Sequence, residues 1–102
     1  QEKYWSKNPG IHPEVGSYLR KNFPKLKGIG FDFISVTSYL HREAGREAHR
    51  QLLAKQPHEK PPILIIEDMH LENLSESPVE MICLPLMLEN ADGGPISVLA
   101  RF

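Results

Sequence analysis

The chain has 102 residues, of which 40% are hydrophobic and 25% are charged, a composition typical of one folded domain and unlike that of a disordered chain. No apolar run approaches the roughly 20 residues that cross a bilayer, and no signal-peptide pattern opens the chain, so we expect a cytoplasmic protein with no membrane partner. The formal net charge is only −1, but residues 1–60 carry eleven Lys and Arg against six Asp and Glu, whereas residues 61–102 carry one against seven.

A turn is predicted at residues 8–10 (Asn-Pro-Gly), and a helix follows over residues 13–23. Pro13 suits the first position of a helix, where its missing N–H has no partner to lose. Apolar residues then recur at helical spacing and are expected to face the core: Val15, Tyr18, Leu19 and Phe23. The helix should end at Phe23 because Pro24 disfavours a helical conformation in the residue before it.

The next predicted element is a strand over residues 27–36. Ile29, Phe31 and Phe33 alternate with other residues and fall on one face of this strand. Asp32 stands between the two phenylalanines. It is either an outward-facing strand residue or a buried acid beside a pocket.

A second helix is predicted over residues 42–55, with His41 at its start. Its charged residues alternate in sign along one face, as a solvated surface does. We therefore expect no nucleic-acid partner, despite the basic first half of the chain. The inner face of this helix should carry Gly45, Ala48, His49 and Leu52.

A polar, proline-rich loop over residues 56–62 contains His58 and should be exposed. Three strands are predicted after it, over residues 63–67, 78–88 and 95–101. The single cysteine, Cys83, can form no internal disulfide and is expected to pack within the second of these strands, in a reducing compartment. The element order, αβαβββ, predicts an α/β fold with a mixed sheet and two helices on one side.

His49 and Glu67 are the main candidates for chemistry. An imidazole that faces the core and a carboxylate at the exit of an apolar strand are both common ligands of first-row metals. From the residues alone, structural roles remain open: the histidine could be hydrogen-bonded to its neighbours, and the carboxylate could pair with an arginine or with backbone amides. Two ligands cannot close a metal site, so further ligands should lie outside this chain.

The other titratable residues are weaker candidates. Asp32 and Asp68 could line a pocket or orient a metal ligand, and His70 lies three residues after Glu67. The remaining histidines are expected to be solvated: His12, His41 and His58. No catalytic residue is identified by a motif, because the sequence has no glycine-rich phosphate loop, no Gly-x-Ser-x-Gly elbow and no cysteine pair.

Four blocks of sequence occur in a characteristic order: residues 28–32 (GIGFD), 48–53 (AHRQLL), 63–67 (ILIIE) and 79–101. In the last block a Leu-Pro-Leu strand leads through an Asp-Gly-Gly-Pro turn into the closing strand. Taken together, these blocks resemble the cyclase family, which includes the bacterial kynurenine formamidases (arylformamidases). The resemblance covers nearly the whole chain.

This resemblance implies that residues 1–102 are the C-terminal half of a single hydrolase domain with a swivelling β/β/α fold. The metal signature of the family, His-x-Gly-Thr-His-x-Asp-x-Pro, belongs to the N-terminal half and is absent here. By resemblance, His49 and Glu67 complete a divalent metal centre, usually zinc or else manganese. Metal-activated water would then hydrolyse an N-formyl or similar carbonyl group of a small-molecule substrate in tryptophan catabolism. The full-length protein is expected to be a homodimer and the isolated fragment inactive.

Two other classes of function stay open at this point. One is a non-catalytic family member or fragment in which His49 and Glu67 are structural. The other is a small binding or assembly module that exposes a sheet edge or an apolar face.

Overall fold

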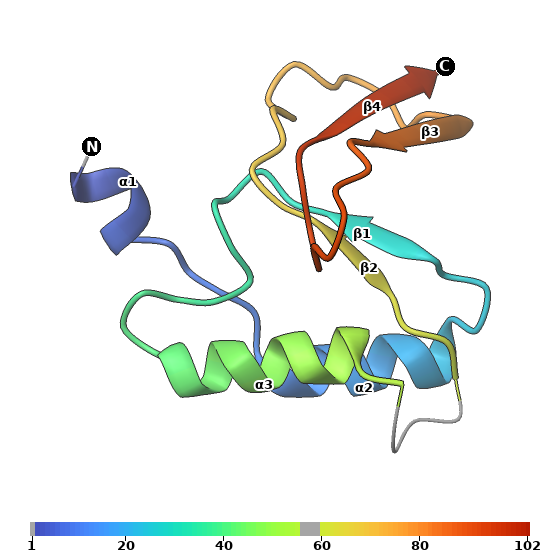
Figure 1. The fold of residues 1–102 in the computed structure, drawn as a ribbon. Helices are drawn as coiled ribbons and strands as arrows, with labels where there is room; N and C mark the ends of the chain where they lie inside the picture. The colour runs from blue at the N-terminus through green and yellow to red at the C-terminus, as the bar shows by residue number, and fades with distance from the viewer. Residues whose placement is uncertain (1, 56–59) are drawn as a thin grey trace. The chain divides into compact units, whose positions relative to one another are not determined.

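The computed structural model describes residues 2–55 and 60–102, and the chain divides into two units, Gln1–Leu71 and Glu72–Phe102. The elements of the first unit are α1 (Glu2–Ser6), α2 (Pro13–Asn22), β1 (Gly28–Gly30), α3 (Arg42–Leu53) and β2 (Leu64–Ile66) (Figure 1). The second unit contains β3 (Glu80–Pro85) and β4 (Ile96–Arg101). The predicted α/β class is confirmed. In the described part of the chain the strands form two separate pairs, one parallel and one antiparallel.

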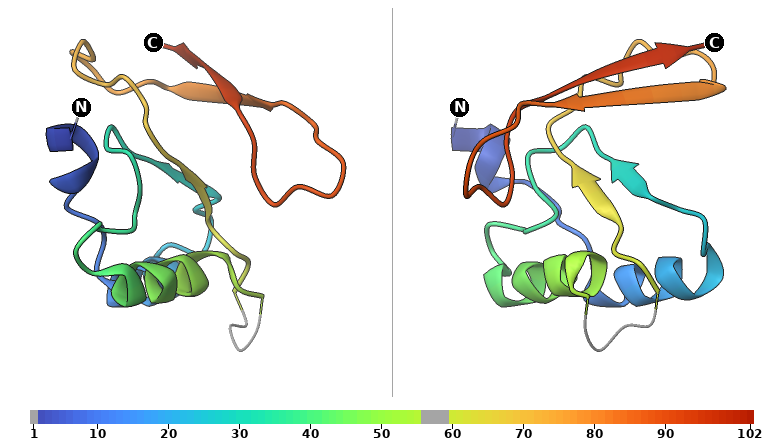
Figure 2. Two further views of the ribbon diagram at one scale, coloured as in Figure 1. Left: turned by 60° about the vertical axis from the view of Figure 1, so that its left-hand side comes forward. Right: turned by 45° about the vertical axis from the view of Figure 1, so that its right-hand side comes forward.

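The first unit is built on the parallel pair of β1 and β2. Gly28 pairs with Leu64 and Gly30 with Ile66. Parallel neighbours need a crossover connection, and α3 lies within it. Helices α2 and α3 lie side by side on the same side of the strand pair in all three views (Figures 1 and 2). The buried apolar side chains come from α3, from the loop before it and from the residue before β2: Ala48, Leu52, Val36 and Ile63.

Helix α2 begins at the predicted Pro13 and ends one residue before the predicted Phe23, which is its C-cap, but it packs through a different face. His12 is the N-cap residue, and its Nδ1 accepts a hydrogen bond from the Glu14 N–H over 3.3 Å. The predicted core residues Tyr18 and Phe23 are 59% and 50% exposed. The buried residues of α2 are Gly16 and Arg20, and Val15 and Leu19 are half-buried, so the expectation of a core position was wrong for Tyr18 and Phe23.

Arg20 is buried because it binds the end of α3. Its guanidinium donates to the carbonyl oxygens of Gln51 (3.0 Å) and Ala54 (2.7 Å), near the last turn of that helix, and also to the Lys60 carbonyl. A helix ends with carbonyl groups that lack intrahelical partners, and a buried arginine satisfies several of them at once. Burial lowers the pKa of Arg20 from its usual value.

Gly16 allows α2 and α3 to approach closely. A Cβ atom added at Gly16 would lie 2.8 Å from the backbone carbon of Gln51, closer than real contacts allow. We expect Gly16→Ala to lower the free energy of unfolding by about 1–3 kcal/mol, because one of the two helix backbones must move away. Urea denaturation measures this, with Lys21→Ala on the exposed side of α2 as the control, expected within about 0.5 kcal/mol of the parent. Equal stability of the two variants would contradict the close contact.

The predicted strand over residues 27–36 is much shorter in the structure, where β1 ends at Gly30. Backbone pairing continues briefly, since the Phe31 N–H donates to the Ile66 carbonyl over 2.9 Å. The chain then bends, and the side chains of Asn8 and Glu67 bind its backbone over residues 35–37. These side-chain contacts replace strand pairing in that segment.

The second unit is an antiparallel hairpin. Glu80 is paired with Arg101 and Pro85 with Ile96, and the two strands are shorter than the predicted 78–88 and 95–101. The Arg101 guanidinium contacts the Glu80 carboxylate at 3.0 Å. Cys83 is exposed, so its predicted packing role is not met within the described chain. A two-stranded sheet has only edge strands, and this one exposes many apolar side chains, including Met81, Ile82, Leu84 and Leu99.

No helix in the described residues is long and apolar enough to cross a membrane. The predicted loop over residues 56–62 is described only from Lys60 onward. Residues 56–59, with the predicted exposure of His58, lie outside the described part of the chain.

Candidate functional site

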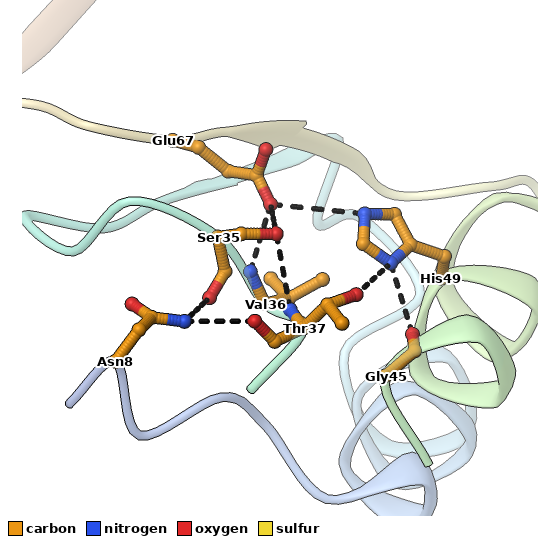
Figure 3. A network of polar contacts seen from close by, with 7 residues as sticks. All are labelled: Asn8, Ser35, Val36, Thr37, Gly45, His49 and Glu67. Atoms are coloured by element: carbon orange, nitrogen blue, oxygen red, sulfur yellow. Dashed lines mark hydrogen bonds and ion pairs between the residues drawn. The ribbon is translucent and has the colours of Figure 1, made fainter. Parts of the chain in front are cut away.

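The structure brings the two main candidate residues together. His49 lies on α3, and Glu67 follows directly after β2. The Nε2 atom of His49 is 3.7 Å from Oε1 of Glu67, and the two side chains are 35% and 30% exposed (Figure 3). They are 18 positions apart in the sequence. The pair therefore lies at the rim of the core, where both side chains are held and still reach solvent.

Two contacts at Nδ1, on the side of the ring away from Glu67, fix the orientation of His49. Its Nδ1 lies 2.9 Å from the Gly45 carbonyl oxygen, one turn earlier in α3, and 3.3 Å from Oγ1 of Thr37. A carbonyl oxygen only accepts, so Nδ1 carries the proton in this arrangement. In the neutral ring, Nε2 then holds the free lone pair and directs it toward Glu67.

Glu67 is held by donors from the loop that follows β1. Its Oε1 accepts hydrogen bonds from the Ser35 hydroxyl (3.0 Å) and from the Val36 N–H (2.8 Å). The Ser35 hydroxyl also accepts from the Thr37 N–H over 3.1 Å, which fixes its direction. Hydrogen bonds to the charged form stabilise a half-buried carboxylate. The other carboxylate oxygen points away from these donors (Figure 3).

Asn8 secures this loop from the opposite side. Its Nδ2 donates to the carbonyl oxygens of Ser35 (2.6 Å) and Thr37 (2.9 Å), and the residue is only 6% exposed (Figure 3). The sequence predicts only a turn at residues 8–10 and does not identify the roles of Asn8, Ser35 or Thr37. Their hydrogen bonds join residues that are far apart in the chain, and no local spacing signals such pairs.

The donor atoms fit part of a metal site. Two ligand atoms that bind one tetrahedral zinc at about 2.0–2.2 Å lie roughly 3.4 Å apart. The 3.7 Å between Nε2 of His49 and Oε1 of Glu67 is close to this separation. The Nδ1–H contact to a backbone carbonyl is also the usual support of a metal-binding histidine. Within residues 2–55 and 60–102, however, no group of three or more His, Cys, Asp or Glu side chains could hold a metal.

Asp32 and Asp68 lie near Tyr4. Both aspartates are exposed, and the Tyr4 hydroxyl donates a hydrogen bond to Asp68. This hydrogen bond raises the pKa of Tyr4, and burial and the charges of the two aspartates raise it further. Asp68 adopts a left-handed backbone conformation, with φ of 58°, which aspartate tolerates better than most residues. A role of either aspartate in supporting a metal ligand stays a prediction.

Of the histidines predicted to be solvated, the structure describes His12 and His41. His12 and His41 are the N-cap residues of α2 and α3, and both are exposed. His70 is exposed as well.

Comparison with known proteins identifies similar enzymes. The chain is 33% identical to the kynurenine formamidase of Bacillus cereus (strain ATCC 10987 / NRS 248), 31% to that of Geobacillus thermodenitrificans and 30% to that of Bacillus anthracis. Each match covers 93 residues, which is 91% of this chain and 40% of the relative. The chain thus spans about 40% of the length of the curated relatives it matches. No family model and no solved structure matches. The resemblance predicted from the sequence is confirmed.

Proposed function

We propose that this chain is the C-terminal part of a metal-dependent amide hydrolase of the kynurenine formamidase kind, and that His49 and Glu67 are two ligands of its divalent cation. The observation that carries the proposal is the convergence of His49 Nε2 and Glu67 Oε1 at 3.7 Å, each held by bonds to the protein behind it. The similarity to kynurenine formamidases over 91% of the chain supports the reaction class.

Zinc is the first choice of metal, with manganese second, because an imidazole and a carboxylate suit both. The remaining ligands come from the rest of the protein, which in the relatives amounts to more than half of the length. A homodimer is part of the same proposal, and only the resemblance supports it.

This chain contributes two metal ligands whose positions are fixed before the metal and the substrate bind. A divalent cation, when bound, supplies a Lewis acid for the amide carbonyl and lowers the pKa of water to near neutrality. His49 offers a fixed lone pair because Gly45 holds its proton on Nδ1. Glu67 offers a negative charge whose position is fixed by Ser35 and Val36. Donors fixed before the substrate arrives need no reorganisation during the reaction.

The test uses the intact gene product and compares His49→Ala with His41→Ala, a matched histidine at the start of the same helix. We expect the parent and His41→Ala to contain stoichiometric zinc or manganese and to hydrolyse N-formylkynurenine. We expect His49→Ala to lose the metal and to lose turnover by about a hundredfold or more. Elemental analysis and an absorbance assay measure the two properties. Full metal content in His49→Ala would show that the ligand is wrong, and a metal-bound parent without formamidase activity would show that the substrate is wrong.

A further inference from the structure

We propose that a pocket at the start of α3 binds the carboxylate of an anionic amide substrate, with Arg42 as its ion-pair partner. This inference rests on the proposed hydrolase function and adds a recognition site to it. The pocket has a volume of about 380 Å³. Its wall includes Trp5, Ser35, Thr37, Tyr39, Arg42 and Arg46, and we call it the arginine pocket.

The arginine pocket shares a wall with the candidate metal ligands. Ser35 lines the pocket and donates its hydroxyl to Glu67, and Thr37 lines the pocket and contacts Nδ1 of His49. A substrate in the pocket would therefore lie against the residues that support both ligands.

The arginines and His49 also form one row along α3. Positions 42, 46 and 49 are spaced by four and three residues, which places them on one stripe of a helix. From Arg42 to His49 the helix rises by roughly 10 Å, at about 1.5 Å per residue. This is the length of a small amide whose anionic group lies at one end and whose scissile carbonyl lies at the other.

Charge distinguishes Arg42 from its neighbours. Arg46 contacts the Glu43 carboxylate, and Arg50 contacts that of Glu47. Arg42 instead lies over the ring of Tyr39, 5.1 Å from its centroid, and has no carboxylate partner among the described residues. Stacking on an aromatic face leaves the edge of the guanidinium free for bidentate contact with a carboxylate.

The aromatic residues give the pocket a flat apolar side. The rings of Trp5 and Tyr39 meet edge to face, with centroids 4.6 Å apart and planes at 73°. Both side chains remain partly exposed, at 39% and 43%, and can still cover a planar group of the substrate. The helix dipole places partial positive charge at the N-terminus of α3, which adds to the attraction for an anion. The His41 side chain makes no capping hydrogen bond there.

The test measures binding of benzoate and of its neutral analogue benzamide to the metal-free gene product by NMR titration. We expect benzoate to bind more tightly than benzamide, and Arg42→Gln to weaken benzoate binding by about tenfold while leaving benzamide unchanged. Arg50→Gln on the same helix is the matched control and should bind both compounds as the parent does. Trp5→Leu should weaken both, because the flat side is lost.

The result is independent of the metal. Benzoate binding should persist in His49→Ala, so a failure of the ligand assignment and a failure of the arginine pocket are told apart. Equal binding of benzoate and benzamide by the parent would overturn the inference. So would an Arg42→Gln variant, confirmed as folded by circular dichroism, that binds benzoate as tightly as the parent does.

Discussion

Glu67→Gln should remove the metal while leaving the fold intact. Glutamine keeps an oxygen that can accept from the Ser35 hydroxyl and the Val36 N–H, so the loop keeps its anchor. The free energy of unfolding of the metal-free protein should change by less than about 1 kcal/mol. The variant lacks the negative charge that a divalent cation requires. Loss of an outer-shell partner weakens metal binding 10–100-fold, so loss of this ligand charge should weaken it by about a hundredfold or more.

Two further variants separate the roles of the carboxylate. Glu67→Ala should lose the metal and also about 1–3 kcal/mol of stability in the metal-free protein, because the Val36 N–H is left without its acceptor. Glu76→Gln, at an exposed position in the second unit, should change neither property. Metal affinity is measured by competition with a chelator, and stability by urea denaturation. A Glu67→Gln protein that keeps the parent's affinity would remove Glu67 from the site.

Arg20→Met should cause the largest loss of stability, about 3–5 kcal/mol. Arg20 is 2% exposed and donates to backbone carbonyls near the end of α3 and at Lys60. Methionine fills a similar volume but leaves these carbonyls without a donor, and each buried unsatisfied group costs about 1–3 kcal/mol. Urea denaturation of the metal-free protein gives the difference.

The matched control is Arg50→Met, which removes an exposed arginine that forms an ion pair with Glu47. Its stability should stay within about 0.5 kcal/mol of the parent. Arg20 also fixes the chain on its way into β2, so its loss should weaken metal binding through Glu67, which follows that strand. Similar stabilities of the two variants would mean that Arg20 does not hold the end of α3.

Local rules predicted α2 and α3 well, because prolines and apolar spacing act within a few residues, but they did not predict the short helix α1. Pro13 begins α2, and the buried residues of α3 include the predicted Ala48 and Leu52. The same rules did not predict which face of α2 is buried. Arginine is usually exposed, so local rules place Arg20 in solvent. It is buried because it binds carbonyl groups at the end of another helix, α3. Gly16 is likewise buried for a reason that lies on α3.

The two candidate ligands of the site could be predicted from residue chemistry and family resemblance, but their supporting residues could not. His49 and Glu67 were both named from the sequence, and they meet in the structure. The residues that orient them were not foreseen, because Ser35, Thr37 and Asn8 are ordinary polar residues whose partners are set by tertiary structure. The loop over residues 35–37 was missed for the same reason, since the side chains of Asn8 and Glu67 bind its backbone there.

Asn8 has a consequence for energetic linkage. It ties the segment just after Trp5 to the loop whose Ser35 and Val36 donate to Glu67. A ligand that orders one of these two segments lowers the entropy cost of ordering the other when a second ligand binds. Thermodynamic linkage then requires that a cation bound by His49 and Glu67 raise the affinity of the arginine pocket for an anion by the same factor as the anion raises the affinity for the cation. Asn8→Ala should remove this coupling between the two sites.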